Sequence, residues 1–243
     1  MKLILNPKTF QNNFINPTLD AIPSGKTALL IENNQISTYY LNPERTESFY
    51  QETTIEDIED PMDRFNIDLN KLSTGMVCIK TEDSVVFHVD KKELTFKNEA
   101  ISFKIRTLEN EMVPLPAYNP KKQEAYKGIV SEFELPNTVL QDIKHADTFA
   151  SDSLKMYLFK ENDSLYLMFG DKQQSYLDSI KVLVKDNFTA SFNERIYRAA
   201  FIRRAFKFKN NTLKMRILDN GTLMLIATAT NTKTIYSSTP IKQ

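Results

Sequence analysis

The chain has 243 residues, 41% of them hydrophobic and 26% charged, which is an ordinary composition for a soluble globular protein. Its 31 Lys and Arg residues balance 31 Asp and Glu residues, so the chain is not a bulk polycation. A single Cys excludes intrachain disulfides and zinc ribbons, and only five Gly residues exclude a glycine-rich phosphate-binding loop.

The first half of the sequence predicts mostly short β-strands, because polar and apolar residues alternate in runs rich in Val, Ile and Thr. We expect these strands over residues 27–32, 35–41, 84–90, 94–98 and 101–107. Helical periodicity is confined to two stretches: residues 7–15, a helix that Pro17 should end or kink, and residues 70–80.

The second half predicts the same kinds of element in the same order. Strands are expected over residues 154–160, 164–170, 181–186, 212–218 and 222–228, and helices over residues 138–150 and 194–206. The dipeptide Phe65-Asn66, which precedes one expected helix, recurs 127 residues later as Phe192-Asn193 before another. A repeat of this length indicates a duplicated domain rather than a solenoid.

A Pro-rich segment separates the two copies. It contains Pro114, Pro116 and Pro120, a composition typical of an exposed linker. We therefore predict an N-terminal domain, a linker and a C-terminal domain over residues 1–110, 111–128 and 129–243.

The zero net charge hides an asymmetry, since residues 1–122 carry a net charge of −4 and residues 123–243 a net charge of +4. Cations concentrate in one basic segment, whose members are Arg195, Arg198, Arg203, Arg204, Lys207 and Lys209. Only Glu194 is acidic in the amphipathic helix expected there, so the segment predicts contact with the phosphates of a polyanion. An ordinary solvated helix is the alternative.

No set of residues predicts catalysis. His88 and His145 are the only imidazoles, and His145 is expected on the polar face of a helix rather than in an acid/base pair. Cys78 lies among apolar residues and is expected in the core. The acidic run over residues 56–63 lacks the spacing of a calcium loop and is expected to be a solvated loop. We therefore expect no enzyme activity, no metal and no cofactor.

The order of elements resembles that of the sliding clamps, which are DNA polymerase processivity factors, and most of all the two-domain clamps of phages. The resemblance is carried by residues 65–72 and 192–206, which look like the junction of strand and helix in each clamp domain, and by residues 212–238, which look like three closing strands. It implies an α+β fold built from a duplicated clamp domain, with helices lining a central hole and antiparallel sheets outside. Two domains per chain imply a homotrimeric ring.

The resemblance also implies which residues act. Cations of the helices would face duplex DNA without reading its sequence, namely Lys8, Lys71, Lys80, Lys144, Arg198, Arg203, Arg204 and Lys207. A partner peptide would dock in a groove beneath the linker, formed by Tyr39, Tyr40, Leu41, Val113, Pro114, Leu115, Tyr236, Pro240 and Ile241. Alternatively, these apolar residues simply pin the linker to its own domain. Copies of the chain would meet at Ile101, Phe103, Ile105 and Tyr176, with the second side of the joint near residues 174–179.

The partners implied are duplex DNA, a DNA polymerase, a clamp-loader ATPase and further copies of the chain. No apolar run approaches the roughly 18 residues of a membrane span, so we expect a cytoplasmic protein without a membrane partner. Two alternatives stay open. One is a monomeric DNA-binding processivity subunit of the same fold, and the other is an unrelated all-β viral structural or binding protein.

Overall fold

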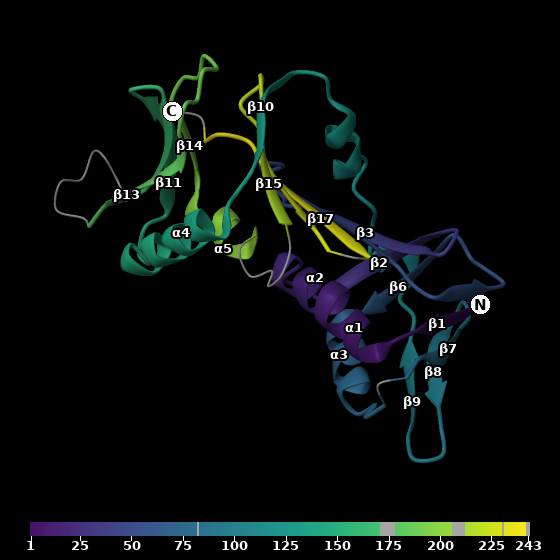
Figure 1. Ribbon diagram of the computed structural model, residues 1–243. Coiled ribbons are helices and arrows are strands. Elements are labelled where there is room, and N and C mark those ends of the chain that lie inside the picture. Colours follow the sequence, from purple (N-terminus) through teal and green to yellow (C-terminus); the bar gives the residue numbers. More distant parts are fainter. Residues whose placement is uncertain (82, 171–177, 206–211, 230, 242–243) are drawn as a thin grey trace. The chain divides into compact units, whose positions relative to one another are not determined.

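The computed structural model describes residues 1–243 except 82, 171–177, 206–211, 230 and 242–243 (Figure 1). The chain forms two compact units. The first unit consists of Met1–Tyr40, Phe49–Pro120 and Ala229–Thr234, and the second of Leu41–Ser48, Lys121–Thr228 and Ile235–Gln243. Two strands, β4 (Glu47–Thr54) and β17 (Thr232–Ser238), have residues in both units.

The first unit contains an antiparallel five-stranded sheet in the order β5-β1-β7-β8-β9. Its strands are β1 (Lys2–Leu5), β5 (Asp57–Glu59), β7 (Val85–Val89), β8 (Glu93–Lys97) and β9 (Ser102–Arg106). A second group runs in the order β6-β2-β3-β4, with β17 beside β4. Its other strands are β2 (Lys26–Glu32), β3 (Gln35–Leu41) and β6 (Arg64–Asp68). Strand β9 is therefore a free edge in the described chain.

The helical segments of the first half are α1 (Pro7–Phe10), the π-helical η1 (Gln11–Ile15), α2 (Asn16–Ala21) and α3 (Leu69–Val77). Of the two effects predicted for Pro17, ending the first helix does not occur, because helical segments continue through Ala21. Pro17 lies in the first turn of α2, where a backbone N–H would have no partner within that helix, so proline costs no hydrogen bond there. The π-helical segment η1 directly precedes α2 and connects it to α1. Helix α3 ends at Val77, so Lys80 lies beyond the helix on which it was expected.

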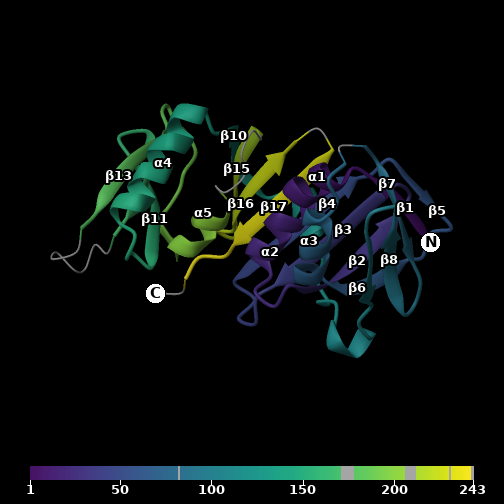
Figure 2. The same cartoon turned by 90° about the horizontal axis from the view of Figure 1, so that it is seen from below.

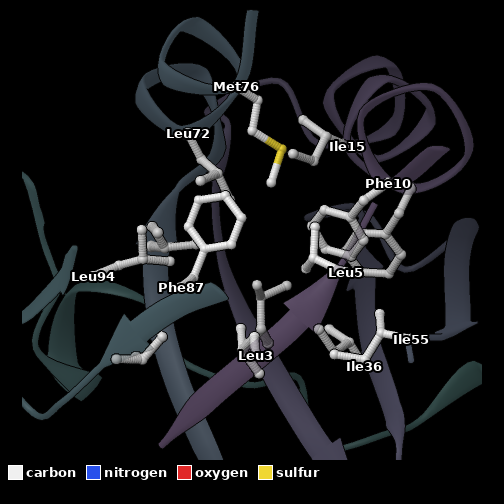
Figure 3. Packing of buried hydrophobic residues seen from close by; sticks show 14 of the residues in the cluster. Leu3, Leu5, Phe10, Ile15, Ile36, Ile55, Leu72, Met76, Phe87 and Leu94 are labelled. Atoms are coloured by element: carbon white, nitrogen blue, oxygen red, sulfur yellow. The ribbon is translucent and has the colours of Figure 1, made fainter. Parts of the chain in front are cut away.

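The helices of the first unit cover one face of its strands, as Figure 2 shows for α1, α2 and α3. Leu72 and Met76 of α3 are buried near Phe87 of β7, and Phe10 lies beside Leu5 of β1 (Figure 3). Burying each such side chain contributes roughly 1.5–3 kcal/mol. The apolar side chains of each helix are thus part of the core, and its polar side chains face solvent.

The second unit contains the strands β10 (Ile129–Glu134), β11 (Lys155–Glu161), β12 (Ser164–Phe169), β13 (Ile180–Lys185), β14 (Arg195–Arg198), β15 (Thr212–Leu218) and β16 (Leu223–Thr228). One group runs in the order β10-β15-β16-β17, with β4 beside β17, and the other in the order β13-β12-β11-β14. Its α-helices are α4 (Asn137–Phe149) and α5 (Ala199–Ala205). The linker contains the short 3-10 helices η2 (Asn110–Met112) and η3 (Pro120–Ala125).

The two halves of the chain repeat one topology. The order β1-β7-β8-β9 corresponds to β10-β15-β16-β17, and the order β6-β2-β3-β4 corresponds to β14-β11-β12-β13. Each half also has one helical segment after its first strand and one after its β6 or β14 strand. The duplication and the α+β class predicted from the sequence are confirmed.

Two elements differ from the sequence prediction. Residues 195–198, expected in a helix, form strand β14, in which Tyr197 is fully buried and Arg198 exposed. Tyr197 lies opposite Met156 of β11, and its hydroxyl donates to the carbonyl of Gly221 over 2.7 Å. These contacts hold residues 195–198 as a strand of the sheet. Strand β4 was not predicted, because several of its buried residues, such as Gln51, are polar. Its sequence therefore does not show the alternation of polar and apolar residues that indicates a strand.

Two smaller expectations are also wrong. Cys78 is exposed rather than in the core, since it follows the last turn of α3, one position after the exposed Val77. Part of the acidic run forms strand β5 instead of a loop. There the buried Ile58 alternates with two exposed acids, and Lys2 of the neighbouring strand forms an ion pair with Glu59.

Candidate nucleic-acid interface and peptide-docking residues

The predicted DNA-facing cations of the first unit are exposed. Lys8 lies in the last turn of α1, Lys71 lies in α3, and Lys80 follows the end of α3. A hydrogen bond of 2.8 Å from Gln11 Nε2 to Ser73 Oγ joins η1 to α3, so the two helical segments present their polar faces together. Apart from the lysines, the exposed side chains of this helical surface are mainly neutral, such as those of Asn12, Asn13 and Asn16.

Local capping fixes where these helices begin. The side chain of Asn6 accepts from the backbone N–H of Thr9 over 2.8 Å, and Asp68 accepts from the N–H of Asn70 over 3.0 Å. A cap of this kind contributes about 1 kcal/mol. Lys71 is thereby held in the first turn of α3, one residue after Asn70.

In the second unit the predicted residues fall on three elements. Lys144 is half-buried on α4, next to the exposed His145, whereas Arg203 and Arg204 are half-buried on α5. Arg198 lies on strand β14 and not on the expected helix, which corrects its assignment to a helix face. Lys207 lies outside the described residues.

The arginines of α5 form hydrogen-bonded ion pairs within the second unit. Arg203 donates from Nε to Asp147 Oδ1 of α4 over 2.6 Å. Arg204 donates to Glu47 Oε2 over 3.0 Å, and the Glu47 side chain is only 10% exposed. Each pair joins α5 to another element, so both arginines have a structural role.

Arg198 has a partner too, because it forms an exposed ion pair with Glu44. Three of the predicted DNA-binding arginines are therefore at least partly neutralised by carboxylates that lie far from them in sequence. Lys71, Lys80 and Lys144, by contrast, have no carboxylate partner among the described residues. These lysines are therefore more available to an external phosphate than the three arginines are. The DNA-binding assignments of all these residues stay predictions.

The first half of the linker is anchored to the first unit. The Arg64 side chain donates to the carbonyl of Val113, which is itself buried, and Asn66 donates to the Asn110 side chain over 2.9 Å. Tyr39 donates from its hydroxyl to the carbonyl of Pro116 over 3.3 Å, and desolvation raises the pKa of this hydroxyl.

Of the other predicted groove residues in the first unit, Pro114 is exposed, and Tyr40 and Leu115 are half-buried. These environments fit both the groove and the alternative that the apolar residues pin the linker. The groove therefore stays a prediction.

The remaining predicted groove residues lie in the second unit. Tyr236 is buried in β17, Leu41 and Pro240 are half-buried, and Ile241 is exposed. The backbone N–H of Ile241 donates to the carbonyl of Ile196 over 2.7 Å. The C-terminal segment is thus held against strand β14.

The predicted subunit joint includes residues of a free sheet edge. Phe103 and Ile105 lie in β9, the last strand of its sheet, and Ile101 precedes it. Ile105 is buried, and Phe103 packs against Gly75 of α3, so these side chains face the core of their own unit. A contact at this edge would therefore use the backbone and the exposed side chains of the strand, such as Lys104 and Arg106. Tyr176 lies outside the described residues.

Strand β13, which follows Tyr176 in sequence, is likewise the last strand of its sheet.

Among the residues described, no three His, Cys, Asp or Glu side chains are placed to hold a metal ion. None of the helices in the described ranges is long and apolar enough to span a membrane.

A scan against models of protein families and a search of curated proteins found no match. Solved structures do match. The PCNA of A. fulgidus, bound to the C-terminal region of FEN-1, has a TM-score of 0.77 at 12% identity, and the match covers 100% of this chain and 98% of that one. The PCNA2-PCNA3 complex from Sulfolobus tokodaii has a TM-score of 0.73 at 11% identity, with 99% of each chain covered. A DNA polymerase sliding clamp from Pseudomonas aeruginosa has a TM-score of 0.67 at 11% identity, covering 100% of this chain and 65% of that one. The chain therefore has the fold of the sliding clamps.

Proposed function

We propose that this protein is a sliding clamp: three copies close into a ring around duplex DNA and tether a DNA polymerase to it. The observation that carries the proposal is the fold, a duplicated unit that matches PCNA over nearly the whole length of both chains. Encirclement keeps the protein on DNA by topology, so it requires no tight contact and no reading of bases.

Two of the free sheet edges in the described chain support a ring. Strand β9 ends one sheet and strand β13 ends another, and each leaves backbone N–H and C=O groups without a neighbouring strand in the described chain. Pairing β9 of one copy with β13 of the next would satisfy these groups. Such a joint is heterologous, because it joins two different surfaces. It gives a closed ring when the rotations between successive copies add up to a full turn.

The ion pairs of the basic segment favour the ring over the monomeric alternative. A monomer that holds DNA through this segment would need free arginines, yet Arg203 and Arg204 are paired with Asp147 and Glu47. A ring needs only weak phosphate contacts that can shift along the duplex. Lysines such as Lys71, on a helical surface whose other exposed side chains are mainly neutral, suit that requirement.

The proposal includes protein partners. The A. fulgidus PCNA binds a region of FEN-1, and a Helicobacter pylori beta clamp with a TM-score of 0.66 binds a DNA ligase peptide. By analogy we assign this chain a peptide-docking surface for a polymerase near the linker. A separate clamp-loader ATPase would open the ring, since the sequence has no phosphate-binding loop. The protein itself would act without catalysis, in the cytoplasm.

The first test is mass in solution. Light scattering should give three times the chain mass of 28.1 kDa for the ring and one chain mass for a monomeric subunit. A concentration series is needed, because a weakly closed ring dissociates on dilution. A single-chain mass at every concentration would contradict the ring.

The second test separates enclosure from adhesion. Protein is mixed at high concentration with nicked circular duplex, so that rings that open spontaneously can thread the DNA, and is then washed with salt. We expect retention on the circle, release after the circle is cut, and retention again when the cut ends carry bulky blocking proteins. Equal retention on open linear and circular DNA would show simple adhesion.

A further inference from the structure

The first unit has a basic pocket on its five-stranded sheet. Its volume is about 400 Å³, and it lies between the start of β8 and the end of β9. Four cations line it, from Lys91, Lys92, Lys104 and Arg106, against two acids, Glu93 and Glu109. We call this site the β8–β9 pocket.

Most of the positive charge in this pocket is not neutralised by ion pairs. Lys104 forms an ion pair of 2.6 Å with Glu93, but Lys91, Lys92 and Arg106 form none with the residues that the structure describes. Like charges gathered in a concave site raise the local positive potential, and an anion that entered would lower it.

A further acid, Asp90, lies in the turn that precedes β8. The carboxylate of Asp90 accepts from the backbone N–H groups of Lys92 and Glu93, over 2.7 and 2.9 Å. These hydrogen bonds hold the pKa of Asp90 below its usual value, and the charge of Lys92 is a smaller cause of the same shift. The acceptor capacity of Asp90 is thus directed mainly at the turn between β7 and β8 rather than at the cations of the pocket.

The walls of the pocket are fixed by hydrogen bonds. The hydroxyl of Thr107 donates to the carbonyl of Lys91 over 2.7 Å, and the N–H of Thr107 donates to the carbonyl of Lys92 over 2.9 Å. In the β8–β9 ladder Arg106 lies directly opposite Glu93. The backbone that carries the cations is therefore positioned before any ligand binds, which lowers the cost of binding.

We propose that the β8–β9 pocket binds a small oligophosphate, meaning a di- or triphosphate group that is free or part of a nucleotide. The guanidinium of Arg106 suits two phosphate oxygens at once, and the ammonium groups of Lys91 and Lys92 supply further charge-assisted hydrogen bonds. A multiply charged anion matches three cations outside ion pairs better than a single carboxylate does. The proposal does not rest on the proposed tethering function, but Arg106 also lies on β9, the edge of the proposed ring joint, so the mass of each variant in solution is measured beside its affinity.

Isothermal titration calorimetry of the full chain with inorganic pyrophosphate and inorganic triphosphate tests this proposal, at a constant ionic strength of about 0.15 M. We expect saturable binding of both at one site per chain. Replacing two cations, Lys92→Gln with Arg106→Gln, should weaken binding by at least tenfold. Both side chains are exposed, so the fold should survive, which circular dichroism would check.

Two single variants sharpen the test. Lys97→Gln removes an exposed cation from the far end of β8, outside the pocket, and should leave the affinity within about twofold. Glu93→Gln removes a negative charge and releases Lys104, so it should tighten binding about threefold. No binding at millimolar pyrophosphate would overturn the proposal, as would equal weakening by Lys97→Gln and by the double variant.

The source of the oligophosphate is read from a second titration. Adenosine triphosphate that binds at least ten times more tightly than inorganic triphosphate assigns the pocket to nucleotides, and equal affinities assign it to the phosphates alone. Both results support an oligophosphate site. A short DNA duplex is titrated against bound triphosphate as a competitor. If the duplex displaces triphosphate at a lower concentration of phosphate groups, and its binding is weakened equally by replacing Arg106, the pocket is part of a nucleic-acid surface and the proposal is overturned.

Discussion

Arg203 donates from Nε to Asp147 Oδ1 over 2.6 Å, so the basic segment of the second unit is tied to α4. The same guanidinium donates to the carbonyls of Ser151 and Ser153, over 2.8 and 3.2 Å, just after the end of that helix. A cation at the C-terminus of a helix also favours the helix dipole. Arg203 thus holds α4 and α5 together, whether or not DNA lies near it.

The first prediction is that Asp147→Asn destabilises the protein. The pair is about one-third exposed on the arginine side and less on the aspartate side, so we expect a loss of about 1 kcal/mol in the free energy of unfolding. Urea denaturation measures this loss. Asp142→Asn is the matched control, because Asp142 is exposed on the same helix and should change stability little. Equal effects of the two variants would mean that the ion pair does not stabilise the unit.

The second prediction concerns the lysines of the helical surfaces. Lys71→Gln and Lys144→Gln should each weaken binding of duplex DNA by a similar factor for all sequences, because phosphate contacts carry no sequence information. Each should also reduce the slope of log affinity against log salt, by up to about 0.9 for every phosphate that the protein no longer neutralises. Fluorescence anisotropy over a salt series measures both effects. Lys97→Gln on strand β8 is the control, and an equal weakening there would place the DNA elsewhere.

The third prediction uses the ladder between β8 and β9. The N–H of Thr107 donates to the carbonyl of Lys92, and the N–H of Asn98 donates to the carbonyl of Ile101. Hydrogen-bonded and non-bonded pairs alternate along an antiparallel ladder, so the N–H of Ser102 points to the free edge of the sheet. Ser102→Pro removes this donor without breaking the ladder, as edge strands tolerate proline.

We expect Ser102→Pro to abolish or strongly weaken the trimer in light scattering, while circular dichroism and the melting temperature stay close to those of the wild type. Ser102→Ala keeps the N–H and should keep the trimer. A Ser102→Pro protein that still forms the full trimer would exclude β9 from the joint.

The duplicated fold could be predicted because it depends on local patterns. Strand β15 was predicted with its observed bounds, since Leu213, Met215 and Ile217 alternate with polar residues along it. Strand β4 was missed, because its inward side chains include Gln51 and Thr53, whose hydrogen-bond partners come from other elements. A buried polar residue looks like a surface residue until its partner is known.

The basic segment shows the same limit for the candidate site. Its sequence holds one acid, Glu194, so it resembled a free cationic surface. The carboxylates that pair with its arginines belong to Glu44, Glu47 and Asp147, which are brought close only by the fold. Charge along the sequence therefore overestimated the charge available to DNA. The β8–β9 pocket was overlooked for the converse reason, because its cations are spread over two strands.

The fourth prediction is a change in pH dependence. The hydroxyl of Ser164 donates to Asp186 Oδ1 over 2.8 Å, and this bond is the main cause that lowers the pKa of Asp186 below its ordinary value. A carboxyl whose pKa is lower in the folded state stabilises the protein at neutral pH. This contribution is lost as the pH falls through the lowered pKa. Ser164→Ala should therefore lose less stability on acidification than the wild type does.

The measurement is the urea midpoint at neutral pH and at a pH of about 3. Ser164→Ala lowers the midpoint at neutral pH, but the difference between the two pH values should shrink. Ser191→Ala, at an exposed position, should keep the difference of the wild type. An unchanged difference in Ser164→Ala would show that this hydrogen bond does not govern the titration of Asp186.

The last prediction concerns salt and the proposed joint between copies. Both free edges expose cations: Lys104 and Arg106 on β9, and Lys181 and Lys185 on β13. Glu93 and Glu161 neutralise Lys104 and Lys181 within their own units. Arg106 and Lys185 form no such ion pair in the described part of the chain, so a joint between these edges would bring like charges together.

Salt screens this repulsion. The trimer should therefore tighten, by about two- to threefold in its dissociation constant, when the salt concentration rises from about 0.05 M to about 0.5 M. Arg106→Glu should tighten the trimer at low salt and reverse its salt dependence, because it places an acid across the joint from the cations of β13. Adding Lys185→Glu to that variant restores like charges and should loosen the trimer again, whereas Lys97→Glu on β8 should change little. Sedimentation equilibrium over the salt series measures each constant. A wild-type trimer that weakens steadily with salt would mean that opposite charges hold the joint, and these two edges would then not face each other.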